Sequence, residues 1–210
     1  MTLQPNSPEA RDVAYLLHPY TKLKTHQKTG PVIMERGEGV YVWDNAGNKF
    51  LEGMAGLWST ALGFNEERLI NAATEQMKVL PYYHQFAQKS HLPGIDLAER
   101  LIKMAPAEMS KVIFSNSGSE ANDTAIKLIW YYNNARGRHH KKKIISRIQG
   151  YHGVTVATAS LTGKPNNHQG FDLPIANILH THNPHYYRGA HAGESEEDFA
   201  TRMADALENM

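Results

Sequence analysis

The sequence predicts an α/β protein that begins with a small antiparallel sheet and continues into a larger, mostly parallel one. Short runs of β-branched and aromatic residues between glycine turns precede residue 53, and apolar residues recur with helical spacing after residue 65. The segment 111–148 has the order strand, helix, strand, which is typical of a βαβ unit. With 210 residues, 41% of them hydrophobic, the chain is long and apolar enough to bury a core.

The block up to about Gly53 is predicted to consist of short strands. A turn that contains two glycines follows the first run, and the sequence Asp-Asn-Ala-Gly-Asn follows the second. These turns favour a three-strand antiparallel meander. The expected strands are 32–36, 40–43 and 49–52.

The later part of the chain is predicted to alternate helices with strands. Pro81 ends the first long helix, and Gly137 ends the helix of the βαβ unit. The last apolar stripe continues to the final residue without a cap, so we expect this helix to run to the end of the chain, as in a fragment. The expected helices are 65–80, 94–104, 121–137 and 197–210. The expected strands are 111–115, 144–148 and, more weakly, 176–180.

Composition argues against several classes of protein. Lys and Arg total 22 and Asp and Glu total 21, so the net charge of +1 gives no field that would attract nucleic acid or an anionic membrane. The absence of Cys excludes disulfide scaffolds, thiolate zinc sites and cysteine nucleophiles. The first residues lack a basic start followed by an apolar run, and no uncharged stretch is long enough to span a bilayer. We therefore expect a cytoplasmic protein that binds neither membrane nor nucleic acid.

The turn between strand 111–115 and the following helix is a candidate anion site. It contains Ser117, Gly118 and Ser119, and the first turn of a helix offers unpaired amides and the positive end of the helix dipole. The spacing matches neither the P-loop nor the dinucleotide motif. A plain helix cap, with Ser117 or Ser119 as N-cap, explains the same residues.

A second candidate binding element follows strand 144–148. In Gly150-Tyr151-His152-Gly153 the glycines leave room for the Tyr151 ring to offer its face to a flat ligand, whereas an ordinary exposed aromatic is the simpler explanation. Together, the turn and the loop indicate a site for a planar, phosphorylated heterocycle. Pyridoxal phosphate and flavin mononucleotide both meet this description.

These two segments carry a family resemblance. Residues 115–125 (SNSGSEANDTA) and 150–153 (GYHG) resemble the cofactor segments of class III aminotransferases, the fold type I family that uses pyridoxal phosphate. The resemblance continues through 56–58, 62–64 and 80–86 and covers the chain from about His18. It implies the N-terminal portion of that fold: the antiparallel meander of the small domain in 1–60, and the first part of a mostly parallel, three-layer large domain in 61–210.

The resemblance also assigns cofactor-binding roles. It implies that the backbone amides of Gly118 and Ser119 hold the phosphate, with Ser117 nearby. It places Tyr151 against the pyridine ring and His152 beside it. The cofactor expected from this resemblance is pyridoxal 5'-phosphate.

Three aromatic residues resemble substrate-binding positions of the family. Trp58 and Tyr20 correspond to walls of the pocket, and Phe86 to a residue contributed across a homodimer interface; core packing is the alternative for each. The contexts of Trp58 and Phe86 are most similar to the omega-amino acid–pyruvate branch. The implied reaction moves an amino group from an omega-amino acid or amine to pyruvate. An enzyme of the γ-aminobutyrate or ornithine type that uses 2-oxoglutarate is an alternative, as is a catalytically incomplete pyridoxal-phosphate-binding chain.

The resemblance lacks the family's catalytic lysine. Transamination needs a lysine amine that forms a Schiff base with the cofactor, and in the family this residue lies C-terminal to the aromatic loop. Lys127 and Lys164 match no family nucleophile. We therefore assign no catalytic residue and expect the chain alone to be inactive.

Two other constellations are weighed and set aside. His180, His182 and His185 suggest a metal site, but Pro184 breaks their spacing and no carboxylate lies within the run, so no metal is expected. The basic run 136–143 suggests nucleic acid, but it also suits a solvated loop at a helix C-terminus, where cations complement the dipole.

Overall fold

The computed structural model describes residues 3–106 and 108–210; Met1 and Thr2, which begin the segment considered for a secretory signal, and Ala107 lie outside it. The chain divides into two compact units, Met1–Leu92 and Pro93–Met210. The division into small and large domains at residue 60 stays a prediction, because compactness within this chain does not define the domains of longer relatives.

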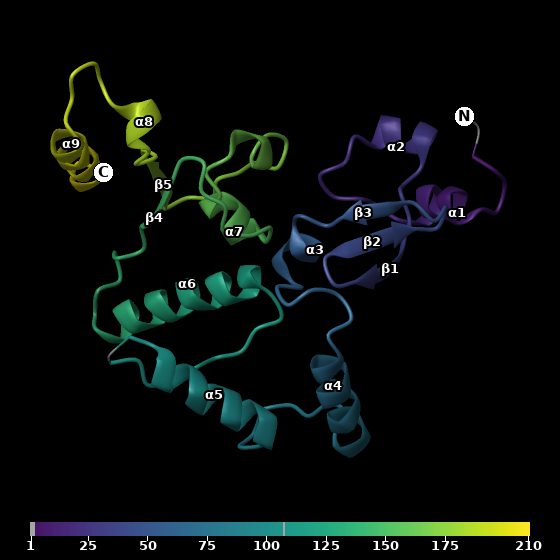
Figure 1. The fold of residues 1–210 in the computed structure, drawn as a ribbon. Helices are drawn as coiled ribbons and strands as arrows, with labels where there is room; N and C mark the ends of the chain where they lie inside the picture. The colour runs from purple at the N-terminus through teal and green to yellow at the C-terminus, as the bar shows by residue number, and fades with distance from the viewer. Residues whose placement is uncertain (1–2, 107) are drawn as a thin grey trace. The chain divides into compact units, whose positions relative to one another are not determined.

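The first unit contains the predicted antiparallel meander, preceded by two helices. Helices α1 (Pro8–Tyr15) and α2 (Leu23–Thr29) lead into strands β1 (Met34–Glu38), β2 (Tyr41–Asp44) and β3 (Lys49–Leu51), in the order β1-β2-β3 (Figure 1). The meander is confirmed, but the expectation of strands alone up to Gly53 is wrong. Ser7 begins α1, since its side chain accepts the amide of Ala10 and Pro8 follows at the first helical position. These start signals outweigh the weak apolar periodicity of the segment.

Aromatic and cationic side chains contact one another across the strands of the meander. The guanidinium of Arg36 lies 3.7 Å from the ring centre of Trp43, and the ammonium of Lys49 lies 3.8 Å from that of Tyr41. Beyond the sheet, Phe64 exchanges two backbone hydrogen bonds with Gly39. These bonds attach the loop that follows the short helix α3 (Ala55–Trp58) to the meander. The unit continues with α4 (Glu67–Val79), close to the predicted helix 65–80.

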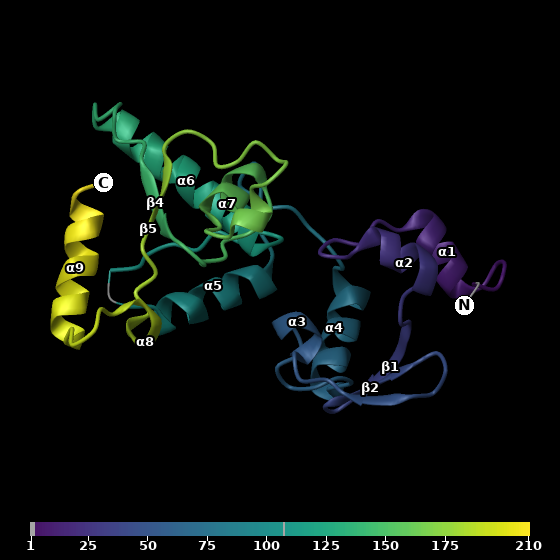
Figure 2. The same cartoon turned by 90° about the horizontal axis from the view of Figure 1, so that it is seen from above.

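The second unit is a parallel α/β arrangement around a small apolar core. Strands β4 (Ile144–Arg147) and β5 (Ile178–Thr181) pair in parallel, and the connection between them contains α7 (Val156–Leu161) and a short 3₁₀ turn (Pro165–Asn167). Ile126, Leu161 and Ile178 form the buried cluster. In both Figure 1 and Figure 2, α7 and α9 lie on opposite sides of the β4–β5 pair. The remaining helices of this unit are α5 (Leu92–Met104), α6 (Gly118–Ala135), α8 (Tyr186–Gly189) and α9 (Glu196–Glu208).

The predicted strand 111–115 is not formed. The observed βαβ unit consists of β4, α7 and β5. A strand exists only where a neighbour completes its backbone hydrogen bonds, and no described residue pairs with the segment 111–115. Its side chains remain exposed, with Ile113 at 65% and Phe114 at 41%. The predicted strands 144–148 and 176–180 are confirmed and supply β4 and β5, joined through α7. The α/β class therefore holds, with an antiparallel sheet followed by parallel strands.

The predicted final helix is present but ends before the last residue. Helix α9 begins at the N-cap Ser195 and ends at Glu208, where Asn209 is the C-cap. The expectation that it continues to Met210 is wrong, because the backbone of Asn209 leaves the helical conformation and the amide of Met210 bonds the carbonyl of Leu207, three residues back instead of four. Among the described residues, no helix is both long enough and apolar enough to cross a lipid bilayer.

Candidate functional site

The first turn of α6 combines a helix cap with free backbone donors. Ser117 is the N-cap, and its hydroxyl accepts the amide of Glu120 at 3.2 Å, while the carboxylate of Glu120 accepts the amide of Asn116 at 2.8 Å. The predicted cap is therefore formed by Ser117. Within residues 3–106 and 108–210, the amides of Gly118 and Ser119 have no hydrogen-bond acceptor. A Cβ on Gly118 would meet nothing within 4 Å, so an acceptor can approach this turn closely.

The loop that carries Tyr151 and His152 is hydrogen-bonded directly to the start of α6. The amide of Val154 donates to the Ser119 hydroxyl at 3.0 Å, and the side-chain amide of Asn122 donates to the carbonyl of His152 at 2.8 Å. These two bonds join segments that are 35 and 30 residues apart. The structure thus brings the predicted phosphate turn and the predicted ring-binding loop together within one unit.

Buried hydroxyl groups of α7 and of its C-cap, Thr162, hold the loop in place. Thr158, Ser160 and Thr162 have no exposed surface. The hydroxyl of Thr162 accepts the amide of His152 at 3.0 Å, and that of Thr158 accepts the amide of Thr155 at 3.0 Å. Every one of these polar groups is paired, so the loop is fixed by specific bonds rather than by apolar packing alone.

Gly153 permits the close approach of loop and helix. Its φ is +135°, and a Cβ at this position would lie 2.5 Å from the hydroxyl oxygens of Ser119 and Thr158. An L side chain rarely adopts that backbone conformation, and no side chain fits in that space. Glycine is therefore required here for the loop to reach α6.

The ring of Tyr151 is available to a ligand. Its side chain is 54% exposed, and the ammonium of Lys164 lies 5.7 Å from the ring centre. His152 is half-buried, and its backbone is held on both sides by Asn122 and Thr162. The loop that carries Tyr151 is thus hydrogen-bonded to a turn with two unpaired amides, and backbone amides at a helix start are donors suited to an anion such as a phosphate group.

Asn122 and Thr162 are positioning residues that sequence reasoning missed. Asn122 contacts the loop across 30 residues and Thr162 across 10, so no local motif joins them to it. The only available signal was the periodicity of α6: Asn122 lies three residues after Ser119, which places the two side chains on one face of the helix.

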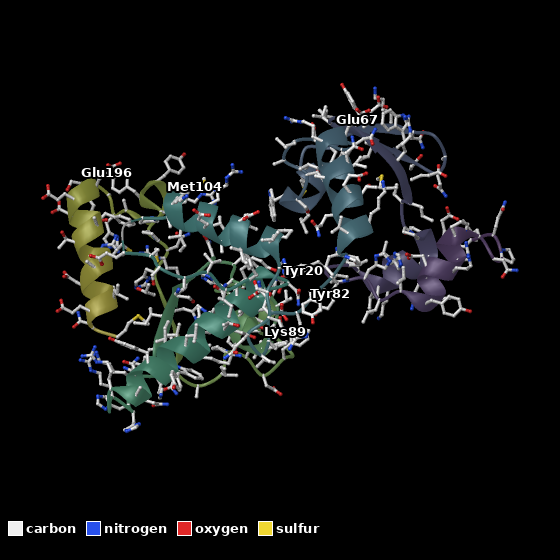
Figure 3. All side chains as sticks on the ribbon, turned by 90° about the horizontal axis from the view of Figure 1, so that it is seen from below. Tyr20, Glu67, Tyr82, Lys89, Met104 and Glu196 are labelled. Atoms are coloured by element: carbon white, nitrogen blue, oxygen red, sulfur yellow. The ribbon has the colours of Figure 1, made fainter. Side chains whose placement is uncertain are left out.

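The three aromatic residues predicted to bind substrate lie in the other unit. Tyr20, Trp58 and Phe86 are 79%, 77% and 79% exposed. The side chain of Tyr20 is labelled in Figure 3. The alternative of core packing is therefore not seen in this chain. Tyr20 and Trp58 have positive φ values of +50° and +64°, and Ala87 and Gln88 after Phe86 have +51° and +63°. Strained non-glycine backbone of this kind is concentrated at functional sites.

The histidine run 180–185 and the basic run 136–143 have other contacts in the described part of the chain. The imidazole of His180 bonds the carbonyl of Leu161 at 3.2 Å, and it does not converge with His182 and His185 on a common point. In the basic run 136–143 at the C-terminal end of α6, Lys142 donates to the side-chain oxygen of Asn134 at 2.6 Å. Expectations about metal and nucleic acid remain predictions.

Comparison with known proteins decides the family. The class III aminotransferase family model matches residues 23–210. The chain belongs to the class III aminotransferase family. This family uses pyridoxal phosphate, so the predicted cofactor is confirmed for the family, as is the relation to fold type I transaminases.

Relatives of this aminotransferase differ in the substrates that their names give. A probable gamma-aminobutyrate transaminase 2, mitochondrial, of Oryza sativa subsp. indica is 55% identical over 93% of the chain and 39% of the relative. The crystal structure of the omega transaminase from Pseudomonas jessenii in complex with PMP is 60% identical, has a TM-score of 0.95 and matches 97% of this chain and 45% of that one. A thermostable omega transaminase variant W58G, engineered for asymmetric synthesis of enantiopure bulky amines, gives the same values. The chain thus spans about two fifths of the length of the curated relatives it matches.

Proposed function

We propose that this class III aminotransferase chain supplies the phosphate- and ring-binding half of the cofactor site of an omega-amino acid or amine–pyruvate transaminase. The observation that carries the proposal is the hydrogen-bonded junction between the start of α6 and the loop 150–154, in which two amides are left for an anion. The family match supports pyridoxal phosphate over flavin mononucleotide as the occupant.

The proposed cofactor contacts follow from the donors at the junction. The amides of Gly118 and Ser119 bind phosphate oxygens, and the positive end of the 18-residue helix α6 adds to the attraction. The Ser119 hydroxyl, which accepts the Val154 amide, keeps its own proton to donate. Tyr151 covers the ring through its exposed face, and His152 lies beside it. Ser117 stabilises the turn as the N-cap.

The chemistry of the reaction comes from the cofactor, which withdraws electrons from the substrate carbon when bound. What this chain's residues do is bind and orient: the amides fix the phosphate, and Tyr151 fixes the plane of the ring. No lysine of the chain is assigned to covalent binding. We propose that the catalytic lysine belongs to sequence that the longer relatives have beyond the matched part.

We propose an omega-amino acid or amine as the donor and pyruvate as the acceptor. The omega-transaminase structures at 60% identity support this assignment. A γ-aminobutyrate transaminase that uses 2-oxoglutarate is the second candidate, favoured by the names of the curated relatives. γ-Aminobutyrate is itself an omega-amino acid, so both candidates share a donor amine that is distant from any carboxylate.

We propose that Trp58, Tyr20 and Phe86 limit the size of the donor. The substituted tryptophan of the engineered neighbour has the same number as Trp58, and that variant was made for bulky amines. A homodimer, with Phe86 contributed across its interface, and a cytoplasmic location are part of the proposal; gel filtration and cell fractionation of the native protein test them.

Equilibrium dialysis of the purified chain against pyridoxal phosphate and against pyridoxal tests the cofactor site. Binding should require the phosphate and should weaken about tenfold or more in Ser119→Ala, since a hydrogen bond to a charged group contributes about 1.5–3 kcal/mol. Ser195→Ala is the matched control, because it removes the N-cap of α9 in the same unit. Equal affinity for both ligands, or no effect of Ser119→Ala, contradicts the proposal.

Two further measurements test whether this chain contains the catalytic lysine and which substrates the native protein uses. Borohydride reduction in the presence of pyridoxal phosphate, followed by intact mass, should leave the chain at 23.6 kDa. One specific adduct, for instance at Lys164, would show that this chain does contain the nucleophile. For the native protein isolated from its source, a panel of donors with pyruvate or 2-oxoglutarate separates the two substrate assignments.

A further inference from the structure

Three potential metal ligands converge in the first unit, whereas the residues assigned to the cofactor belong to the second. Asp12 lies on α1, His26 on α2, and His18 on the segment between them. Nε2 of His18 lies 2.8 and 3.0 Å from the two carboxylate oxygens of Asp12, and Nε2 of His26 lies 3.0 Å from one of them. The ligand atoms of all three residues lie within 4.8 Å of one another.

His26 is the residue that points to a ligand. Its side chain is only 8% exposed, and Nε2 is buried without a hydrogen-bond partner among the described residues, although Asp12 is near. A buried polar atom left in this way costs about 1–3 kcal/mol. A cation between the carboxylate and the two imidazole nitrogens would pair His26 and would offset the negative charge of Asp12, whose side chain is 14% exposed.

We propose that Asp12, His18 and His26 bind a zinc ion through one carboxylate oxygen and two Nε2 atoms. Zinc accepts nitrogen and carboxylate ligands at about 2.0–2.2 Å in tetrahedral geometry, which separates the ligand atoms by roughly 3.3 Å. The separations of 2.8 and 3.0 Å between the Asp12 oxygen and the two imidazole nitrogens need only a small expansion, and the two nitrogens lie within 4.8 Å of each other. The exposed side of His18, at 31%, leaves a route for the ion and for a fourth ligand from solvent.

The zinc ion would have a structural role and not a catalytic one. It would join α1 to α2 and close the segment 12–26, whose backbone adopts a positive φ at Tyr20. Metal binding to a folded site stabilises the fold by mass action. The sequence alone does not predict this site, because spacings of six and eight residues match no metal motif.

The test uses the tag-free 210-residue chain, stripped with a chelator and dialysed against zinc. We expect one zinc per chain by elemental analysis, a higher midpoint of thermal unfolding with zinc than without, and visible absorption typical of tetrahedral coordination when cobalt replaces zinc. Asp12→Asn and His18→Gln preserve side-chain shape and should each weaken binding roughly tenfold or more, since even the loss of an outer hydrogen bond at a metal site costs about 10–100-fold.

His182→Gln is the matched control, because His182 is an exposed histidine that does not belong to the group of three converging ligands. It should bind one zinc with unchanged affinity. Circular dichroism confirms that each variant is folded; if Asp12→Asn is not, His18→Gln decides, since His18 is the more exposed ligand. The proposal is overturned if the chain takes up no zinc, if folded His18→Gln binds zinc as the original chain does, or if His182→Gln abolishes binding.

Discussion

Replacement of Gly153 by alanine should separate the ring-binding loop from α6. The new methyl carbon would lie 2.5 Å from the Ser119 and Thr158 hydroxyl oxygens and 2.8 Å from Cβ of Thr158. Ser119 and Thr158 are held by hydrogen bonds to Val154 and Thr155, so neither can move away without losing a bond. The loop must move instead, and it carries Tyr151 with it.

The cost of Gly153→Ala has two parts. An alanine at the φ of +135° is strained by about 1–3 kcal/mol. Overpacking against two fixed neighbours adds about 1–3 kcal/mol. The free energy of unfolding of the second unit should therefore fall by about 2–6 kcal/mol, and the affinity for pyridoxal phosphate should fall with it.

Gly170→Ala is the control for backbone strain without overpacking. Gly170 has a φ of +79°, and a Cβ there would meet nothing within 4 Å. Urea titration followed by circular dichroism, together with hydrogen exchange of peptides that cover residues 150–163, measures both variants. If Gly153→Ala destabilises the chain no more than Gly170→Ala and leaves exchange in the loop unchanged, the close approach does not constrain the loop and the reasoning fails.

Three other predictions concern stability elsewhere. Hydrogen bonds from Arg202 lower the pKa of Glu194 to about 2 from 4.5, so the folded state favours the carboxylate. The stability that this pair contributes is complete above pH 4.5 and is lost as the pH falls toward 2. Glu194→Gln should therefore reduce the dependence of the melting temperature on pH across that range. Phe199→Ala should cost about 3–5 kcal/mol because the ring is 4% exposed, whereas Tyr187→Ala, at 89% exposure, should change a urea midpoint little. Asp44→Ala should speed hydrogen exchange at the turn after β2, since its carboxylate accepts two turn amides; unchanged exchange would show that these bonds are dispensable.

The elements that were predicted correctly are those whose signals are local. The meander follows from turns that occupy only a few residues, and α6 follows from a cap and a repeating apolar face. The approach of the loop 150–154 to α6 was inferred from chain order alone, and it is borne out by the Ser119–Val154 hydrogen bond. The residues that support this loop could not be predicted, because Thr162 and Asn122 act across distant parts of the chain.

The predicted elements that are not formed depend on partners that a local pattern does not contain. Residues 111–115 have the composition of a buried strand, yet strand formation requires a neighbour, and the described chain offers none. Helices α1 and α2 are not predicted because their apolar pattern is weak; α1 begins with the Ser7 cap and Pro8, whereas α2 has no side-chain cap. The convergence of Asp12, His18 and His26 depends on the arrangement of these two helices and was missed with them.

Cofactor binding and substrate choice should be separable by mutation in this aminotransferase. The proposed phosphate and ring contacts come from α6 and the loop 150–154 and are fixed by hydrogen bonds within the second unit. Trp58 is 77% exposed on a left-handed turn of the first unit, where Ala55 and Leu57 also have positive φ values. Removing its ring therefore breaks none of the hydrogen bonds that hold the cofactor contacts.

Trp58→Ala should thus leave the affinity of the chain for pyridoxal phosphate within about twofold, whereas Ser119→Ala should lower it about tenfold. In the native protein, Trp58→Ala should widen the range of accepted donors toward bulkier amines, because a large side chain that limits a pocket rejects substrates by steric overlap. Dialysis and donor panels on the two variants measure both effects. If Trp58→Ala weakened cofactor binding as strongly as Ser119→Ala, the two functions would share residues and the proposed division between the units would be wrong.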